Sequence, residues 1–153
     1  MIEVGKKAPD FKLTGSDGKV YRLKDFSGSK LILYFYPKDD TPGCTIEACD
    51  FRDNLKIFEK NNFTIVGVSA DDEVSHKKFI DKYNLNFLLL SDVDKTTINK
   101  YGVWREKNKF GKVYFGIVRT TFVIDKNGIL ENIYNNVVAK EHIQNILKDF
   151  ENK

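Results

Sequence analysis

The sequence predicts an α/β fold in which a mixed central β-sheet is flanked by helices on both faces. Continuous apolar runs, typical of buried strands, alternate with segments that carry the spacing of amphipathic helices. Two short turns, at residues 16–18 and 125–128, are each flanked by apolar segments, which indicates hairpins. The 153 residues are 41% apolar and 31% charged, as in ordinary globular proteins. Since no repeat or linker divides the chain, we expect a single domain over residues 1–153.

The first elements are a hairpin, a buried strand and a helix. Apolar residues on both sides of Ser16-Asp17-Gly18 predict an N-terminal hairpin over residues 10–26. The uninterrupted apolar run at 30–36 is typical of a central strand. Apolar residues then recur at spacings of four and three, which predicts a helix over 45–60.

The middle of the chain repeats this alternation. A strand is expected at 63–70, followed by a helix that Asp71 or Asp72 can cap. A short buried strand at 87–90 and a short helix at 94–101 come next.

The last third contains a loop, a second hairpin and a closing helix. The polar segment 105–112 is interpreted as a loop, and the strands 117–125 and 129–135 flank the second turn. A helix over 139–150 ends the pattern. The order of these elements is typical of a thioredoxin-like fold.

The charge and hydropathy of the chain exclude some classes of function. The chain has 25 basic and 22 acidic residues, interleaved along its length, so it does not have the basic patch of a nucleic-acid-binding protein. The longest apolar run is too short to span a bilayer, and the first residues lack a secretory pattern, so we expect a cytoplasmic protein without a membrane partner. In that reducing compartment a cysteine pair is more often catalytic, redox-active or metal-binding than structural.

The first cysteine, Cys44, is predicted to lie in the first turn of a helix. Thr41 is a good N-cap and Pro42 suits the first helical position. The helix N-terminus favours a thiolate, but it supplies at most ~2 kcal/mol, less than the roughly 3.4 kcal/mol that a mostly ionised thiol needs at neutral pH. A cation is therefore required. The candidates are Arg52, Arg105 and Arg119, and Arg119 is the most suggestive because it interrupts an apolar run.

The second cysteine, Cys49, is badly placed for a static disulfide with Cys44. Residues five apart in an intact helix have Cα atoms ~8.7 Å apart, beyond the roughly 7 Å limit for a disulfide. If the two cysteines bond, the first turns of the helix must unwind. This favours a bond that forms and breaks in a reaction cycle.

The segment YPKDDTPGCTIEACDFRD resembles the active-site segment of the peroxiredoxins, whose pattern is Pro-x-x-x-Thr/Ser-x-x-Cys, here Pro37, Thr41 and Cys44. The second cysteine five residues later is similar to the peroxiredoxin Q subgroup, also called bacterioferritin comigratory protein. The segments GKKAPDF, YGVW and RTTFVIDKNG also resemble that subgroup, so the likeness extends over nearly the whole chain.

This resemblance implies a monomeric, thioredoxin-fold peroxidase that reduces hydrogen peroxide and organic hydroperoxides without metal or haem. Cys44 would be the peroxidatic thiolate and would become a sulfenic acid. The Thr41 hydroxyl and the backbone N–H of Cys44 would hold the two peroxide oxygens, and Arg119 would orient the substrate and stabilise the thiolate and the developing charge. Pro37 would shield the thiolate from water. Cys49 would resolve the sulfenic acid as an intramolecular disulfide, which thioredoxin or a similar dithiol protein reduces.

Other interpretations remain open at this point. The chain could be a general thiol-disulfide oxidoreductase, although that chemistry normally uses Cys-x-x-Cys, or a non-enzymatic module with a structural cysteine pair. Cys49 could pack as a small apolar residue. His76 and His142 lie in polar stretches and are expected at the surface, without a zinc-binding spacing to the cysteines.

Overall fold

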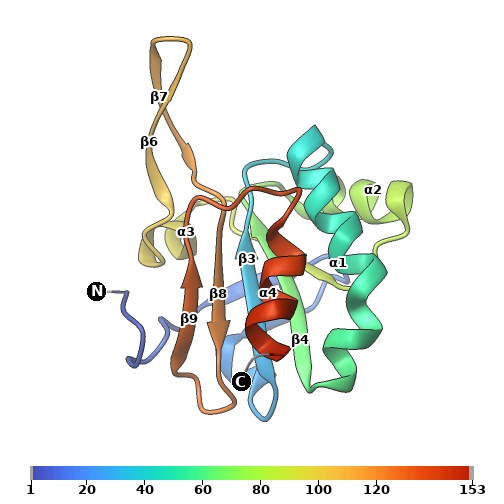
Figure 1. Ribbon diagram of the computed structural model, residues 1–153. Helices are drawn as coiled ribbons and strands as arrows, with labels where there is room; N and C mark the ends of the chain where they lie inside the picture. Colours follow the sequence, from blue (N-terminus) through green and yellow to red (C-terminus); the bar gives the residue numbers. More distant parts are fainter. Residues whose placement is uncertain (1, 152–153) are drawn as a thin grey trace.

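The computed structural model describes residues 2–151. Within them, seven strands form one mixed sheet in the order β2-β1-β5-β4-β3-β8-β9, and β6 and β7 form a separate two-stranded ribbon (Figure 1). The strands are β1 (Lys12–Gly15), β2 (Val20–Arg22), β3 (Lys30–Phe35), β4 (Phe63–Ser69), β5 (Leu88–Ser91), β6 (Trp104–Lys109), β7 (Lys112–Ile117), β8 (Thr120–Ile124) and β9 (Leu130–Tyr134). The helices are the 3₁₀-helix η1 (Leu23–Phe26) and the α-helices α1 (Pro42–Lys60), α2 (Glu73–Tyr83), α3 (Thr96–Lys100) and α4 (His142–Glu151).

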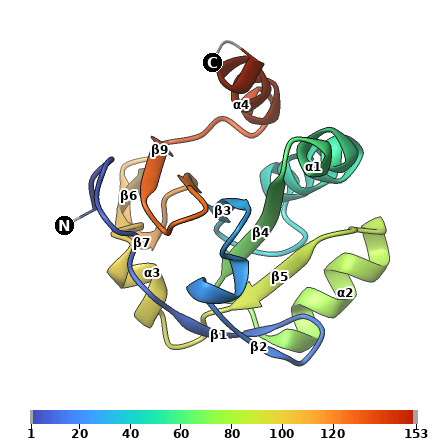
Figure 2. The ribbon, with the colours of Figure 1, turned by 90° about the horizontal axis from the view of Figure 1, so that it is seen from below.

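Helices cover both faces of the sheet, as the sequence predicts (Figure 2). Alternate residues of β3 point to opposite sides, so Ile32 and Tyr34 pack with α1, α2 and α4, whereas Leu31 and Leu33 pack with α3. The apolar run of β3 is therefore buried on both sides, which explains why it lacks a polar alternation.

The strand pairing positions the cysteine segment. Strands β3, β4 and β5 run parallel, and β8 runs antiparallel to β3, with Phe35 opposite Thr120. The end of β3 therefore lies beside the start of β8. The residue just before β8, Arg119, is brought next to the loop that leads from β3 into α1.

The two predicted hairpins of the main sheet are confirmed. β1 and β2 pair antiparallel and add to the sheet through β5, and β8 pairs with β9 across the turn at 125–128. Asp72, one of the two candidate caps, is the N-cap of α2 and accepts a hydrogen bond from the Ser75 amide at 2.9 Å. None of the helices within residues 2–151 is long and apolar enough to cross a membrane.

The prediction of a loop at 105–112 is wrong, because this segment forms β6, a tight turn and the start of β7. Phe110 and Gly111 have positive φ angles of 54° and 77°, the backbone that a two-residue hairpin turn requires. The outer part of the ribbon packs on no core, so its strands lack the apolar alternation by which strands are found. The strand predicted at 117–125 begins only at Thr120, and Val118 and Arg119 connect β7 to β8.

Candidate active site

Helix α1 begins where the sequence places it, with Thr41 at the N-cap position and Pro42 as the first helical residue. The Thr41 side chain, however, does not cap the helix: its hydroxyl donates to the Lys38 carbonyl at 2.7 Å. The chain turns back at Asp40, whose φ of 56° is left-handed, and this turn brings that carbonyl within reach. The Thr41 oxygen keeps its lone pairs available to accept a hydrogen bond from a ligand.

Arg119 is the cation beside the first cysteine. The Cys44 thiol is 1% exposed, and Arg119 Nη2 donates toward its Sγ at 3.4 Å. The other two candidate arginines bind elsewhere, Arg52 to Asp53 and to the Tyr83 carbonyl and Arg105 to the Gly102 carbonyl. A negative charge on Cys44 would therefore be stabilised by both the guanidinium and the N-terminal end of α1.

Gly43 makes the close approach of Arg119 possible. A Cβ atom at this position would lie 3.0 Å from Arg119 Nη2. Gly43 thus leaves room for Arg119 beside Cys44. From the sequence, the small size of this glycine suggests only that a ligand can approach, so its role in the structure is more specific.

Glu47 is a site residue that the sequence reasoning missed. It lies one helical turn after Cys44, is completely buried, and accepts from Arg119 Nη1 at 2.7 Å. Burial raises its pKa to about 7, although Arg119 acts in the opposite direction. A signal was present, because Glu47 falls on the same helix face as Cys44, Ala48 and Phe51, where an acidic residue requires a buried partner.

The expectation that His142 lies at the surface is wrong. It is 3% exposed, with Nε2 at 2.6 Å from Thr121 Oγ1 and 4.0 Å from Glu47 Oε2. Burial and the nearby Arg119 lower the pKa of His142 to about 4, so it is neutral at pH 7. The first turn of α4 carries His142 beside Ile143 on its apolar face, which packs on the sheet.

His76 is also buried, again against expectation. Its Nδ1 lies 2.7 Å from Asp39 Oδ2 and its Nε2 lies 3.0 Å from the Leu90 carbonyl. Since that carbonyl can only accept, Nε2 carries a proton, and the contact of Nδ1 with the carboxylate needs a second proton. The two residues therefore share a buried, hydrogen-bonded proton, and Tyr36 and Ser75 also donate to Asp39, at 2.5 and 2.8 Å.

These contacts fasten the loop before Cys44 to α2. The Asp39 amide donates to Asp71 Oδ2 at 2.8 Å, and Asp40 binds Lys82 and Tyr83 at 2.8 and 2.7 Å. Ligand atoms of Asp39, Asp71 and His76 lie within 4.8 Å of one another, but hydrogen bonds already occupy both nitrogens of the imidazole. We interpret this group as a hydrogen-bonded support for the active-site loop.

Cys49 and Pro37, the remaining predicted site residues, are both half-buried. Cys44 and Cys49 are free thiols, and α1 is continuous across both, so the structure has the separated geometry expected of the reduced pair. Burial raises the pKa of the Cys49 thiol. In the intact helix Cys49 is thus a weak nucleophile, and unwinding that exposes it would increase its reactivity.

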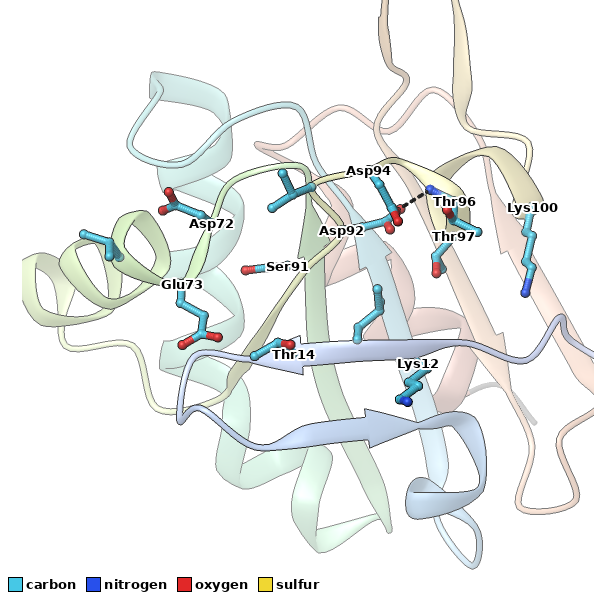
Figure 3. Close-up of a pocket in the computed structure, with 13 residues that line it drawn as sticks. Lys12, Thr14, Asp72, Glu73, Ser91, Asp92, Asp94, Thr96, Thr97 and Lys100 are labelled. Atoms are coloured by element: carbon cyan, nitrogen blue, oxygen red, sulfur yellow. Dashed lines mark hydrogen bonds between the residues drawn. The ribbon is translucent and has the colours of Figure 1, made fainter.

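A cavity of about 770 Å³ lies away from the cysteines, between β1, the start of α2 and the segment after β5 (Figure 3). Thr14, Asp72, Asp92 and Lys100 are among its lining residues, and Cys44, Cys49 and Arg119 are not. The candidate site is therefore identified by the chemistry of its side chains and not by cavity volume.

The site combines a buried cysteine at a helix start, an arginine at its sulfur and a second cysteine in the same helix. On a thioredoxin-like fold, this combination defines a thiol-based redox enzyme. Residues 4–133 match the model of the AhpC/TSA family. The chain belongs to this family, and within it to the peroxiredoxins of the peroxiredoxin Q subgroup, which are thiol-dependent peroxidases.

Individual relatives agree with this assignment. The chain is 48% identical over 147 residues to peroxiredoxin Bcp of Bacillus subtilis, with 96% of this chain and 94% of the relative covered. It is 49% identical over 147 residues to the putative peroxiredoxin bcp of Helicobacter pylori strain J99, covering 96% and 97%. Among solved structures, the bacterioferritin comigratory protein of Xanthomonas campestris, studied for its alkyl peroxide reduction activity, is 35% identical with a TM-score of 0.89, covering 97% of this chain and 98% of that one.

Proposed function

We propose that Cys44 is the peroxidatic residue of this enzyme and Cys49 its resolving residue. The observation that carries the proposal is the 3.4 Å contact between Arg119 Nη2 and Cys44 Sγ at the start of α1. Hydrogen peroxide and alkyl hydroperoxides are the substrates we assign to this site, the latter supported by the activity studied in the Xanthomonas relative.

In the first step, Cys44 Sγ attacks the terminal peroxide oxygen and the O–O bond breaks. The sulfur becomes a sulfenic acid, and the leaving oxygen takes up a proton to leave as water or an alcohol. The Thr41 hydroxyl, which donates to the Lys38 carbonyl, would accept a hydrogen bond from the peroxide, and Arg119 would hold the peroxide and stabilise the developing charge. Pro37 would limit the access of water. The hydrogen bonds at Asp39 and Asp40 would keep the loop that carries these groups in place.

In the second step, Cys49 attacks the sulfenic sulfur, a disulfide forms and water leaves. This step requires the first turns of α1 to unwind, because the helix separates the two sulfurs. Thioredoxin or a similar dithiol protein would then reduce the disulfide. We infer further that the enzyme works as a monomer of one domain in the cytoplasm.

The test is peroxide-dependent NADPH consumption in the presence of thioredoxin and its reductase. Cys44→Ser should abolish turnover, whereas Cys49→Ser should consume about one peroxide per chain and then stall. Full turnover by Cys44→Ser would contradict the assignment of the peroxidatic residue. Reduction of insulin disulfides at a rate comparable with peroxide turnover would instead favour a general thiol-disulfide oxidoreductase.

A further inference from the structure

The β6–β7 ribbon extends from the body of the molecule (Figure 1) and has one face on which every charged residue is basic. Cross-strand partners share a face, so the register places Arg105 opposite Gly116, Lys107 opposite Tyr114 and Lys109 opposite Lys112 on this side. The contacts agree: Lys107 Nζ lies 6.0 Å from the centre of the Tyr114 ring, and a Cβ at Gly116 would meet the Lys107 side chain at 3.2 Å. We call this side the basic face.

The ribbon also exposes large apolar side chains. Phe110 at the turn is 97% exposed, Phe115 on the opposite face is 62% exposed, and Val113 beside it is 55% exposed. Exposed aromatic residues are typical anchors of protein interfaces, and Phe110 lies beside the basic face, with Lys109 Nζ 5.9 Å from the centre of its ring. Charges next to such an anchor steer a partner of opposite sign. The ribbon therefore has the composition of a docking element.

The base of the basic face reaches the active site. Strand β7 ends at Ile117, two residues before Arg119, and Lys107 Nζ donates to the Ile117 carbonyl at 2.8 Å. Lys107 lies within electrostatic reach of the site: burial and Arg119 lower its pKa, and Cys44 acts in the opposite direction. The row of cations thus begins beside Arg119 and Cys44 and continues outward along a strand of roughly 20 Å.

A small peroxide could contact only the inner end of such a face. A surface of this length fits a macromolecule, and its position beside Cys44 requires an occupant that acts on the sulfur. The reaction cycle needs a dithiol protein at this place, whereas it needs neither a lipid surface nor a nucleic acid.

We propose that the basic face of the β6–β7 ribbon binds the acidic surface of the dithiol protein that reduces the Cys44–Cys49 disulfide. This inference rests on the function proposed above. One thiolate of the partner attacks a sulfur of the disulfide, and its second thiol then displaces the mixed disulfide. Two electrons and two protons pass to Cys44 and Cys49, which return as thiols, and the partner leaves as a disulfide.

The test measures peroxide turnover of the unmodified protein and of the variant Lys109→Gln/Lys112→Gln, each with two reductants. This variant leaves Lys107 and the active site intact. With a thioredoxin of net negative charge, kcat/KM for thioredoxin should fall roughly five- to tenfold at low ionic strength, and the difference should vanish at about 0.5 M NaCl. With dithiothreitol, which needs no docking, turnover should be unchanged. The control is Lys56→Gln/Lys77→Gln, which removes the same charge from exposed positions of α1 and α2 and should behave like the unmodified protein.

Equal kcat/KM for variant and unmodified protein would overturn the proposal, as would an equal loss with dithiothreitol, which would mean that the ribbon acts on the site itself. A different outcome is that the unmodified protein co-sediments with phosphatidylglycerol vesicles while the variant does not. If the thioredoxin kinetics of the two are then equal, the basic face binds a lipid surface. If neither reductant supports turnover, the proposed function fails. Titration calorimetry with the same thioredoxin then decides the docking proposal, which requires weaker binding by the variant.

Discussion

Arg119 connects Cys44 to Glu47 through the two terminal nitrogens of its guanidinium group: Nη2 lies 3.4 Å from the sulfur and Nη1 lies 2.7 Å from the carboxylate. The planar, bidentate geometry of arginine allows this double contact, which a lysine ammonium cannot reproduce in the same orientation. The Cys44 thiolate and the Glu47 carboxylate therefore share one cation in a buried site. How strongly Arg119 stabilises the thiolate depends on how strongly it also binds the carboxylate.

Arg119→Met should slow the reaction of Cys44 with hydrogen peroxide by roughly 10²–10³-fold, because it removes a preorganised charged donor from the reacting atoms. Arg119→Lys should recover only part of this loss. The rate is measured by stopped-flow fluorescence in a single turnover, with Arg52→Met as the control for loss of an arginine elsewhere. An unchanged rate constant in Arg119→Met would remove Arg119 from the catalytic site.

Glu47→Gln should change how stability depends on pH. The folded-state pKa of Glu47, about 7, is above its ordinary value of 4.5, so its contribution to stability is fully present below about pH 4.5 and is lost as the pH rises through 7. Relative to Glu47→Gln, the unmodified protein should lose roughly 3 kcal/mol between about pH 5 and pH 8. Urea denaturation across this range measures the difference. Parallel stability curves would contradict it, and Glu59→Gln, at an exposed position of α1, is the matched control.

His76→Ala should destabilise the protein by roughly 3–5 kcal/mol, because it removes the imidazole that binds the buried carboxylate of Asp39 at 2.7 Å. Replacing both residues, in Asp39→Ala/His76→Ala, should cost less than the sum of the two single changes. Chemical denaturation of the four proteins in the cycle measures the coupling. If the two single losses simply add, the pair does not act as a unit, and Lys77→Ala on the exposed side of α2 reports the background effect of a truncation.

Gly43→Ala should impair the reaction with peroxide more than it impairs folding. The new methyl group would lie 3.0 Å from Arg119 Nη2 and would push the end of this flexible side chain away from Cys44. We expect roughly a tenfold slower reaction of the thiol, with a change in unfolding free energy within about 1 kcal/mol, since alanine suits a helix better than glycine. A normal rate together with normal stability would show that Arg119 has room to adjust.

The ribbon and the histidines show where sequence patterns stop being informative. A strand is found by the alternation of buried and exposed residues, and β6 and the outer part of β7 have no buried face to impose one. The polar neighbours of His76 and His142 predict a surface position, yet both side chains face inward from their helices. Helical periodicity can place a polar residue on an apolar face, but it does not identify the distant partner that allows the residue to be buried.

The sequence by itself determined the features that depend on neighbours along the chain: the order of strands and helices, both hairpins of the main sheet, and a cysteine in the first turn of a helix, since capping and periodicity are local properties. Only the tertiary structure decided which arginine reaches Cys44, because the pairing of β3 with β8 joins segments far apart in the chain. It likewise decided that Glu47 shares that arginine and that Asp39 is paired with His76. Charges buried in a protein need partners, and packing alone determines which residues can be those partners.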